Sequence, residues 1–176
     1  ARDVDFEKIA RSTAGLSGAD LKNIVNEAAI LAATSNLKEV NHKELAESIE
    51  KVILGPERKS HLLSIKEKEI SAIHESGHAI VGKSLPNCDP IHKVSIVSRG
   101  MALGYTWTLP LEDRKLYSKA KFEDEIAQFL GGWVAEKIIY GQVTTGAQND
   151  LKRSTQMARD MVMVYGMSEK LGPIVL

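Results

Sequence analysis

Residues 64–86 read SIKEKEISAIHESGHAIVGKSLP, and this stretch decides the fold. Ser64 and Glu67 have the spacing of a capping box, in which each side chain satisfies a backbone N–H at the start of a helix. Pro86 cannot continue a helix. Between them, apolar residues and one glycine recur at helical intervals: Ile70, Ile73, Gly77, Ile80, Val81 and Leu85. The pattern predicts one helix with a buried face.

This helix contains His74-Glu75-Ser76-Gly77-His78, an H-E-x-x-H motif. Residues four apart lie one turn apart on the same helix face. Two imidazoles placed there can reach one zinc ion at about 2.0–2.1 Å. Zinc lowers the pKa of a bound water to about 7. Glu75 can then take the proton of that water as general base while the water attacks a peptide carbonyl. The motif therefore predicts a zinc peptidase site.

A solvated helix that matches the motif by chance is the alternative interpretation. The apolar neighbours Ile73, Ile80 and Val81 favour a buried helix instead. Gly77, inside the motif, costs about 1 kcal/mol of helix stability relative to Ala. Its presence indicates that another element packs closely against the helix. We therefore favour the metal site.

A catalytic zinc site needs a third protein ligand. The candidates are His61, His92, Glu136 and Asp150. His61, before the motif helix, and His92, beside Lys93, fit solvated positions. Glu136 fits an ordinary surface charge in a helix, and Asp150 fits an acid at a helix N-terminus, where the helix dipole favours it. Spacing alone leaves Glu136 and Asp150 open.

The rest of the chain is mostly helical in pattern. Further helices are expected over residues 5–11, after the N-caps Ser17 and Asn41, over residues 119–141 and over residues 151–166. Alternating residues predict two short strands, around Val94 and Ile96 and from Leu103 to Leu109. The expected fold class is mainly α with a small β-sheet. Gly55-Pro56 and the polar stretch after it place a domain boundary between residues 1–55 and 56–176.

Composition excludes some classes of function. Lys and Arg total 23 and Asp and Glu total 23, so the formal net charge is zero and gives no support to binding of nucleic acid. The longest apolar runs are far too short for a membrane span. One cysteine, Cys88, excludes an intrachain disulfide. We expect the lysine cluster Lys115, Lys119 and Lys121 to form a solvated face.

Short motifs spread along the chain carry a family resemblance. They are LSGADL (16–21), VNEAA (25–29), HESGHA (74–79), ALGYT (102–106), LGG (130–132), AE (135–136), TTGA (144–147), NDL (149–151) and YGMSEKLG (165–172). Together they resemble FtsH-type proteases, which are membrane-anchored AAA+ zinc metalloproteases. The first two motifs resemble the helical lid of the ATPase module, the third the zinc helix and the fourth the substrate-edge strand. The others resemble the later helices of the family, so the resemblance covers nearly the whole chain.

The resemblance implies a helical AAA+ lid over residues 1–55 and a helical, zincin-like peptidase domain over residues 56–176, incomplete at its C-terminus. It implies one Zn²⁺ per chain, held by His74, His78 and Asp150, with Glu75 as base. The resemblance thus favours Asp150 over Glu136 as the third ligand. The implied substrate-binding strand residues are Leu103, Gly104, Tyr105 and Thr106.

Two residues depart from the family pattern. Trp133 stands where the family commonly has Arg, and Met101 stands where a basic residue is common. Neither belongs to the implied metal set. We expect these departures to change local salt bridges and substrate contacts.

For the full-length protein, the resemblance implies ATP-dependent degradation of unfolded and membrane proteins in protein quality control. It implies a homo-hexamer held in a membrane by an N-terminal anchor outside this sequence, with no nucleic acid partner. The present part would be soluble and would face the bacterial cytoplasm or an organelle interior. This sequence has no G-x-x-x-x-G-K-[ST] phosphate loop, so we expect ATP to be a cofactor of the full-length protein only. A non-catalytic ring-assembly module is the competing hypothesis, and the intact motif and Asp150 weigh against it.

Overall fold

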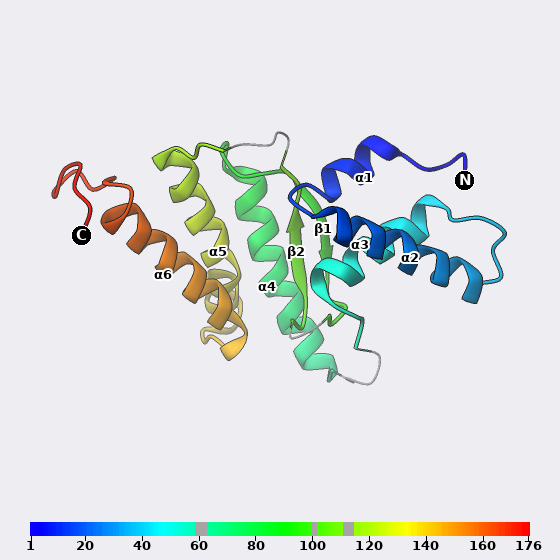
Figure 1. Ribbon diagram of the computed structural model, residues 1–176. Coiled ribbons are helices and arrows are strands. Elements are labelled where there is room, and N and C mark those ends of the chain that lie inside the picture. The colour runs from blue at the N-terminus through cyan, green and yellow to red at the C-terminus, as the bar shows by residue number, and fades with distance from the viewer. Residues whose placement is uncertain (59–62, 100–101, 111–114) are drawn as a thin grey trace. The chain divides into compact units, whose positions relative to one another are not determined.

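The computed structural model describes residues 1–58, 63–99, 102–110 and 115–176. Its elements in chain order are α1 (Phe6–Ser12), α2 (Gly18–Thr34), α3 (His42–Leu54), α4 (Ile65–Ser84), β1 (Ile91–Ser95), β2 (Tyr105–Thr108), α5 (Lys119–Tyr140), the 3₁₀ helix η1 (Thr145–Ala147) and α6 (Gln148–Met163). The expected fold class, mainly α with a small β-sheet, is confirmed (Figure 1). No helix within the described ranges is long and apolar enough to cross a membrane.

The chain divides into two compact units. The first consists of residues 1–61 together with residues 97–102, and the second of residues 62–96 and 103–176. The second unit thus contains the H-E-x-x-H helix, both strands and the two helices that follow them.

Helices of the first unit begin and end at local sequence signals. Ser17 and Asp20 form a reciprocal capping box at the start of α2, with N···O distances of 2.9 and 3.3 Å. The Asp5 side chain accepts the N–H of Lys8 at the start of α1. Gly55 ends α3 with φ at 90°, a conformation that glycine adopts without a steric penalty. The helix starts predicted from these residues are confirmed.

The core of the first unit lies between α2 and α3. It contains Ile24, Ala28, Ala32 and Ile49, each at most 4% exposed. Small alanine side chains on one face of α2 allow α3 to pack closely against it. Arg99 contributes a buried ion pair to the same unit, with its Nη2 3.0 Å from Oε2 of Glu50. Both partners are buried, so this ion pair ties Arg99 to α3.

Layers of the second unit follow the order sheet, α4, α5 and α6 (Figure 1). β1 and β2 are antiparallel, with Val94 opposite Thr106 and Ser95 opposite Tyr105. The strand pair is shorter than the alternating pattern predicted, because pairing ends at Ser95 and Tyr105 while the alternation continues to Ile96 and Leu103. Alternation identified the strands but not their ends.

Two glycines set the closest approach of α4 and α5. A Cβ atom built at Gly77 would overlap the carbonyl oxygen of Gly131, and one built at Gly131 would lie 2.7 Å from the carbonyl oxygen of Gly77. Real Cβ atoms essentially never come within 3.0 Å of such an atom. The close packing predicted from Gly77 is therefore confirmed, and its glycine partner is Gly131.

The expectation that Lys121 lies on a solvated face is wrong. Lys121 is 4% exposed, and its Nζ lies 3.0 Å from Oδ2 of Asp89 and 3.1 Å from Oε1 of Glu125. Burial disfavours the ammonium charge, but the two carboxylates outweigh burial and raise the pKa of Lys121. Asp89 comes from the loop before β1, which the pattern of α5 alone does not reveal.

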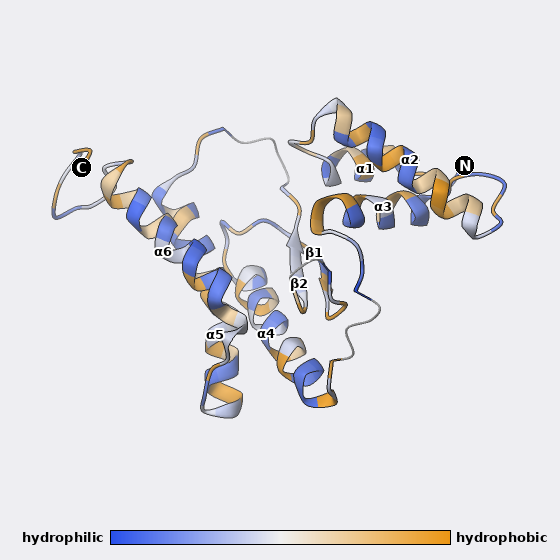
Figure 2. Ribbon diagram, turned by 60° about the horizontal axis from the view of Figure 1, so that its bottom comes forward, coloured by the Kyte–Doolittle hydropathy of each residue, from blue (hydrophilic) through white to orange (hydrophobic). Residues whose placement is uncertain are grey.

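Hydrophilic residues run along most of α6 (Figure 2). Part of its contact with α5 is a cation–π interaction, in which Cζ of Arg153 lies 4.3 Å from the centre of the Phe129 ring. α6 begins at Gln148, so its first turn contains Asp150. It ends at Met163, three residues before the predicted end at Gly166.

We predict that Gly77→Ala lowers the free energy of unfolding by about 1–3 kcal/mol, the usual cost of overpacking. This loss should occur although Ala is favoured over Gly inside a helix by about 1 kcal/mol. Urea unfolding measures the change. Gly18→Ala is the matched control, because a Cβ at Gly18 meets nothing within 4 Å. Equal stability of Gly77→Ala and the unsubstituted protein would contradict the close-packing explanation.

Candidate metal centre

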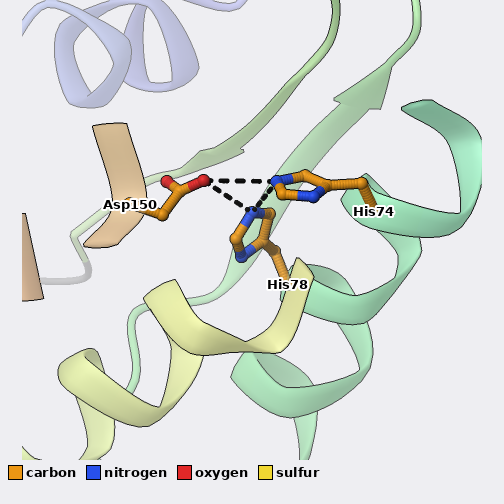
Figure 3. Close-up of side chains that lie close together, drawn as sticks. All are labelled: His74, His78 and Asp150. Carbon is orange, nitrogen blue, oxygen red and sulfur yellow. Dashed lines mark hydrogen bonds and ion pairs between the residues drawn. The ribbon is translucent and has the colours of Figure 1, made fainter. Parts of the chain in front are cut away.

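Three side chains from two helices converge on one point (Figure 3). His74 and His78 come from successive turns of α4, and Asp150 comes from the first turn of α6. Nε2 of His74 lies 3.0 Å from Nε2 of His78 and 3.2 Å from Oδ2 of Asp150. Nε2 of His78 lies 3.5 Å from the same Asp150 oxygen. Residues far apart in sequence thus form one compact group of three possible ligands.

The spacing of these atoms fits a tetrahedral metal site. With metal–ligand bonds of about 2.0–2.1 Å, tetrahedral geometry places ligand atoms about 3.3 Å apart. The three observed separations, 3.0, 3.2 and 3.5 Å, lie around that value. Imidazole nitrogen and carboxylate oxygen are both donors that zinc accepts, and three protein donors are the usual number in a catalytic zinc site. The cluster could therefore hold one metal ion.

Glu136 lies beside His74 at the other ring nitrogen. Its Oε1 is 2.7 Å from Nδ1 of His74, and its Oε2 accepts the backbone N–H of Thr144 at 2.7 Å. The residue is 1% exposed, so the expectation of an ordinary surface charge is wrong. A carboxylate on the far nitrogen of a ligating imidazole orients the ring and raises its basicity.

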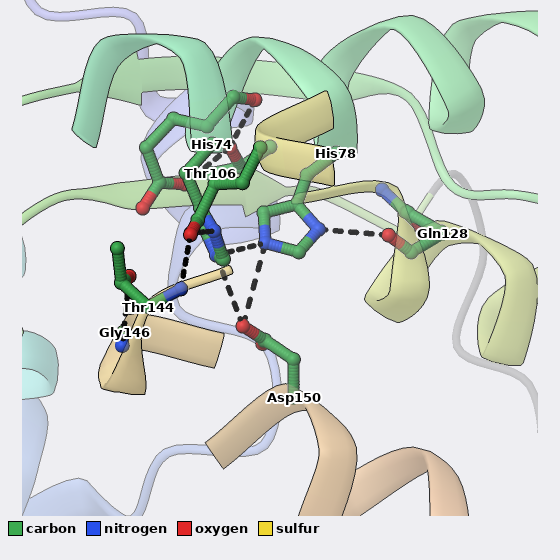
Figure 4. Close-up of polar contacts among 9 residues, drawn as sticks. His74, His78, Thr106, Gln128, Thr144, Gly146 and Asp150 are labelled. Carbon is green, nitrogen blue, oxygen red and sulfur yellow. Dashed lines mark hydrogen bonds and ion pairs between the residues drawn. The ribbon is translucent and has the colours of Figure 1, made fainter. Parts of the chain in front are cut away.

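His78 is oriented in the same way by a backbone group. Its Nδ1 lies 2.8 Å from the carbonyl oxygen of Gln128 in α5 (Figure 4). A carbonyl oxygen can only accept, so Nδ1 of His78 carries the proton and donates it. The lone pair of Nε2 then faces Asp150 and the shared point. The corresponding contact of His74 with Glu136 gives the same tautomer, so both imidazoles offer Nε2 to a metal ion.

Gly132 makes room for the His74 ring. A Cβ built at Gly132 would lie 2.5 Å from both Cε1 and Nε2 of His74. Gln128, Gly132 and Glu136 are spaced four residues apart, so they lie along one stripe of α5. This stripe supports both imidazoles of α4.

The charges of Asp150 and His74 stabilise each other. Burial opposes ionisation of Asp150, but the hydrogen bonds and charges of His74 and His78 outweigh it and hold the pKa of Asp150 well below its usual value. Burial likewise opposes protonation of His74, but hydrogen bonds from Asp150 and Glu136 outweigh it and raise the pKa of His74. A metal dication bound at the same point would replace this proton.

Glu75 lies beside the cluster and not within it. It is 7% exposed, and its Oε2 accepts a hydrogen bond of 2.7 Å from the Thr106 hydroxyl. Burial raises the pKa of Glu75, and the Thr106 hydroxyl and the two histidines only partly oppose this. A buried carboxylate that follows His74 directly, beside the three possible ligands, has the position expected of a base.

The residues implied for substrate binding lie at the start of β2. Tyr105 and Thr106 belong to the strand, and Leu103 and Gly104 precede it. A Cβ at Gly104 would lie 2.7 Å from Oγ of Ser71, so the chain is seated tightly on α4 there. β2 pairs with β1 on one side, and no third strand of the described residues joins this sheet.

The other residues singled out from the sequence lie away from the cluster. His92 is half-buried, and its ring packs edge-on against Trp107 with centroids 5.2 Å apart. Trp133 is half-buried in α5. His61 and Met101 lie outside the described residues.

The supporting contacts of Gln128, Gly132 and Glu136 were not predicted from the sequence. The contact of Gln128 is made by a backbone carbonyl, so its side chain gave no signal. Glu136 had one: it follows Gly132 by four residues and so lies on the same face of α5, and a glycine within a helix can mark a face with a close neighbour. A charged residue on such a face needs a buried partner.

Comparison with known proteins agrees with the sequence motifs. Residues 61–176 match peptidase family M41, and residues 3–47 match the AAA+ lid domain. The chain is 57% identical over 172 residues to the ATP-dependent zinc metalloprotease FtsH 1 of Sphaerobacter thermophilus and 56% identical over 174 residues to FtsH of Rubrobacter xylanophilus. It is also 57% identical over 175 residues to FtsH 3 of Petrotoga mobilis. These alignments cover 98–99% of this chain but 26–27% of each relative, so the chain spans about a quarter of their length. The resemblance stated from the motifs is confirmed.

We predict that zinc affinity separates the direct ligand from its support. Asp150→Ala should lower the affinity by more than 100-fold, because it removes a donor atom and a negative charge. Glu136→Ala should lower it by about 10–100-fold, the range for partners that orient a ligand. Competition with a fluorescent chelator measures both constants.

The control is Glu123→Ala on the same helix, since Glu123 is exposed and pairs only loosely with Lys119 at 3.9 Å. It should leave zinc affinity unchanged. Unchanged affinity in Glu136→Ala would contradict the orienting contact, and unchanged affinity in Asp150→Ala would remove that residue from the ligand set.

Proposed function

The chain belongs to peptidase family M41, and from this we propose that it is the proteolytic part of an ATP-dependent zinc metalloprotease. One observation carries the proposal: His74, His78 and Asp150 place three donor atoms at the separations of zinc ligands. The buried Glu75 carboxylate beside them supplies a base. The reaction is hydrolysis of internal peptide bonds.

We assign the roles of the residues as follows. His74 and His78 would hold one zinc ion through Nε2, and Asp150 would hold it through a carboxylate oxygen that compensates part of the dication's charge. When bound, zinc would polarise the peptide carbonyl and make a water molecule easier to deprotonate. Glu75 would take the proton of that water and return it to the leaving amine.

The elevated pKa of Glu75 suits this role. Its burial favours the protonated form more than solvent does, so the carboxylate is a stronger base than an exposed glutamate. A base works best when its pKa lies near the operating pH. The environment of Glu75 moves its pKa in that direction.

We further propose that substrate lies as an extended strand along β2, from Leu103 to Thr106. Support comes from the two-stranded sheet, in which β2 has β1 on one side only among the described strands, and from the contact of β2 with α4. Backbone pairing of this kind gives affinity with little demand on sequence. That property suits a protease that degrades many unfolded proteins.

For the full-length protein we propose the wider context that its relatives' names support. Residues 1–55 would be the AAA+ lid and residues 56–176 the peptidase domain. ATP would drive unfolding of substrates, including membrane proteins, in a homo-hexamer concerned with protein quality control. A membrane anchor outside this sequence would leave this part facing the bacterial cytoplasm or an organelle interior.

We predict that Glu75→Gln keeps stoichiometric zinc and loses peptide hydrolysis. The amide preserves the shape of the side chain but cannot accept the proton of water. Zinc is measured by atomic absorption and hydrolysis by cleavage of casein, with a chelated sample of the unsubstituted protein as control. Loss of zinc in Glu75→Gln would make Glu75 a ligand or a structural residue, and near-normal turnover would exclude it as the base.

We predict that substrate binding depends on backbone amides at alternate positions. A peptide substrate N-methylated at an amide that pairs with β2 should show a KM raised by up to about 10-fold, the worth of one hydrogen bond. Methylation of the next amide, which points away in a strand, is the matched control and should change KM little. A scan along one fluorogenic peptide measures both. The same KM at every methylated position would contradict strand pairing. The substitution Thr106→Pro would test strand pairing less specifically than peptide methylation, because it also removes the hydroxyl that contacts Glu75.

A further inference from the structure

The Thr106 hydroxyl makes a short contact with the carboxylate of Glu75. Oγ1 of Thr106 lies 2.7 Å from Oε2 of Glu75 and 3.1 Å from the backbone oxygen of the same residue. The hydroxyl has one proton, and the carboxylate is both the nearer and the more negative acceptor. A distance of 2.7 Å is typical of a hydrogen bond from a hydroxyl to a carboxylate. Thr106 therefore donates to Glu75.

The position of Thr106 follows from the way β2 is seated on α4. Gly104, two residues earlier, has no side chain, and a Cβ there would lie 2.7 Å from Oγ of Ser71 and 3.0 Å from Cγ of Glu75. This close approach brings the chain entering β2 against α4 near Glu75. Two residues further on, within β2, the Thr106 hydroxyl reaches the carboxylate of Glu75.

A glutamate side chain has three rotatable bonds, and fixing it costs conformational entropy. A base that is held in place before substrate arrives does not incur this cost during the reaction. His74, the preceding residue, is already held by Glu136 on one side and Asp150 on the other. The Thr106 hydroxyl supplies the corresponding restraint for Glu75.

We propose that Thr106 is a positioning residue that fixes the Glu75 carboxylate, so that the strand which receives substrate also places the base. This inference rests on the proposed function, because it presumes that Glu75 acts as base. It goes beyond that function in giving a second role to a residue of the substrate strand. Placement of the base then depends on a side chain of β2.

Two substitutions isolate the hydroxyl. Thr106→Val keeps the size and branching of the side chain and removes the hydroxyl, whereas Thr106→Ser keeps the hydroxyl and removes a methyl group. In the zinc-loaded protein acting on a short fluorogenic peptide, Thr106→Val should lower kcat by roughly 10- to 100-fold, the range for a hydrogen bond to a charged group, with KM changed less than about 2-fold. Thr106→Ser should restore kcat to within about 3-fold of the unsubstituted protein.

Two further measurements do not depend on turnover. Zinc stoichiometry should be the same in both variants, because Thr106 contacts none of the three ligands directly. In crystal structures, Glu75 should adopt one side-chain conformation in the unsubstituted protein and in Thr106→Ser, and more than one in Thr106→Val. Thr34→Val is the matched control: it removes a threonine hydroxyl that bonds only to its own helix, at 3.0 Å from the carbonyl oxygens of Ile30 and Leu31.

The outcomes separate the possibilities. Unchanged kcat in Thr106→Val, or an equal loss in Thr106→Val and Thr106→Ser, would overturn the inference. A raised KM with unchanged kcat would show that Thr106 only binds substrate, and loss of zinc would show that it only supports the fold. If the unsubstituted protein holds zinc but cleaves no peptide, the proposed function fails; the Glu75 conformations still decide whether Thr106 fixes that side chain.

Discussion

The close approach of α4 and α5 at Gly77 and Gly131 is the constraint on which the rest of the second unit depends. Helices that meet through ordinary side chains stand about 8–10 Å apart. Here the backbone of each helix occupies the place of a side chain on the other. Any larger residue at either position would separate the helices and withdraw the supports of both imidazoles at once. A packing requirement and a chemical requirement thus coincide at the same two positions.

Much of this arrangement could be predicted from the sequence, because its signals are local. The capping box at Ser64 and Glu67 fixed the start of α4, and the spacing of His74 and His78 placed both imidazoles on one face. Gly77 indicated a close neighbour, although it could not say which element that was. The partner is a glycine in α5, more than fifty residues further along, and only the folded chain brings it there.

Long-range contacts account for what the sequence did not reveal. Glu136 and Asp150 were both plausible ligands, and spacing could not separate a carboxylate at Nδ1 from one at Nε2. Which ring nitrogen of His74 Glu136 reaches depends on how closely α5 packs against α4, and the glycine contact between the two helices determines that distance. Lys121 shows the same limitation, since its partner Asp89 belongs to a loop and not to its own helix. Patterns within one element describe its faces, but they do not name what lies against each face.

The two hydrogen bonds of Glu136 have a consequence for coordination number. One oxygen is engaged by His74 and the other by the backbone of Thr144, so neither is available to turn toward the shared point of the cluster. A fourth protein donor would complete a closed tetrahedron, which is the arrangement of structural zinc sites. Glu136 is thus held in a position from which it would not add a fourth donor. An ion held by His74, His78 and Asp150 would then keep one position for water, as catalytic zinc sites do.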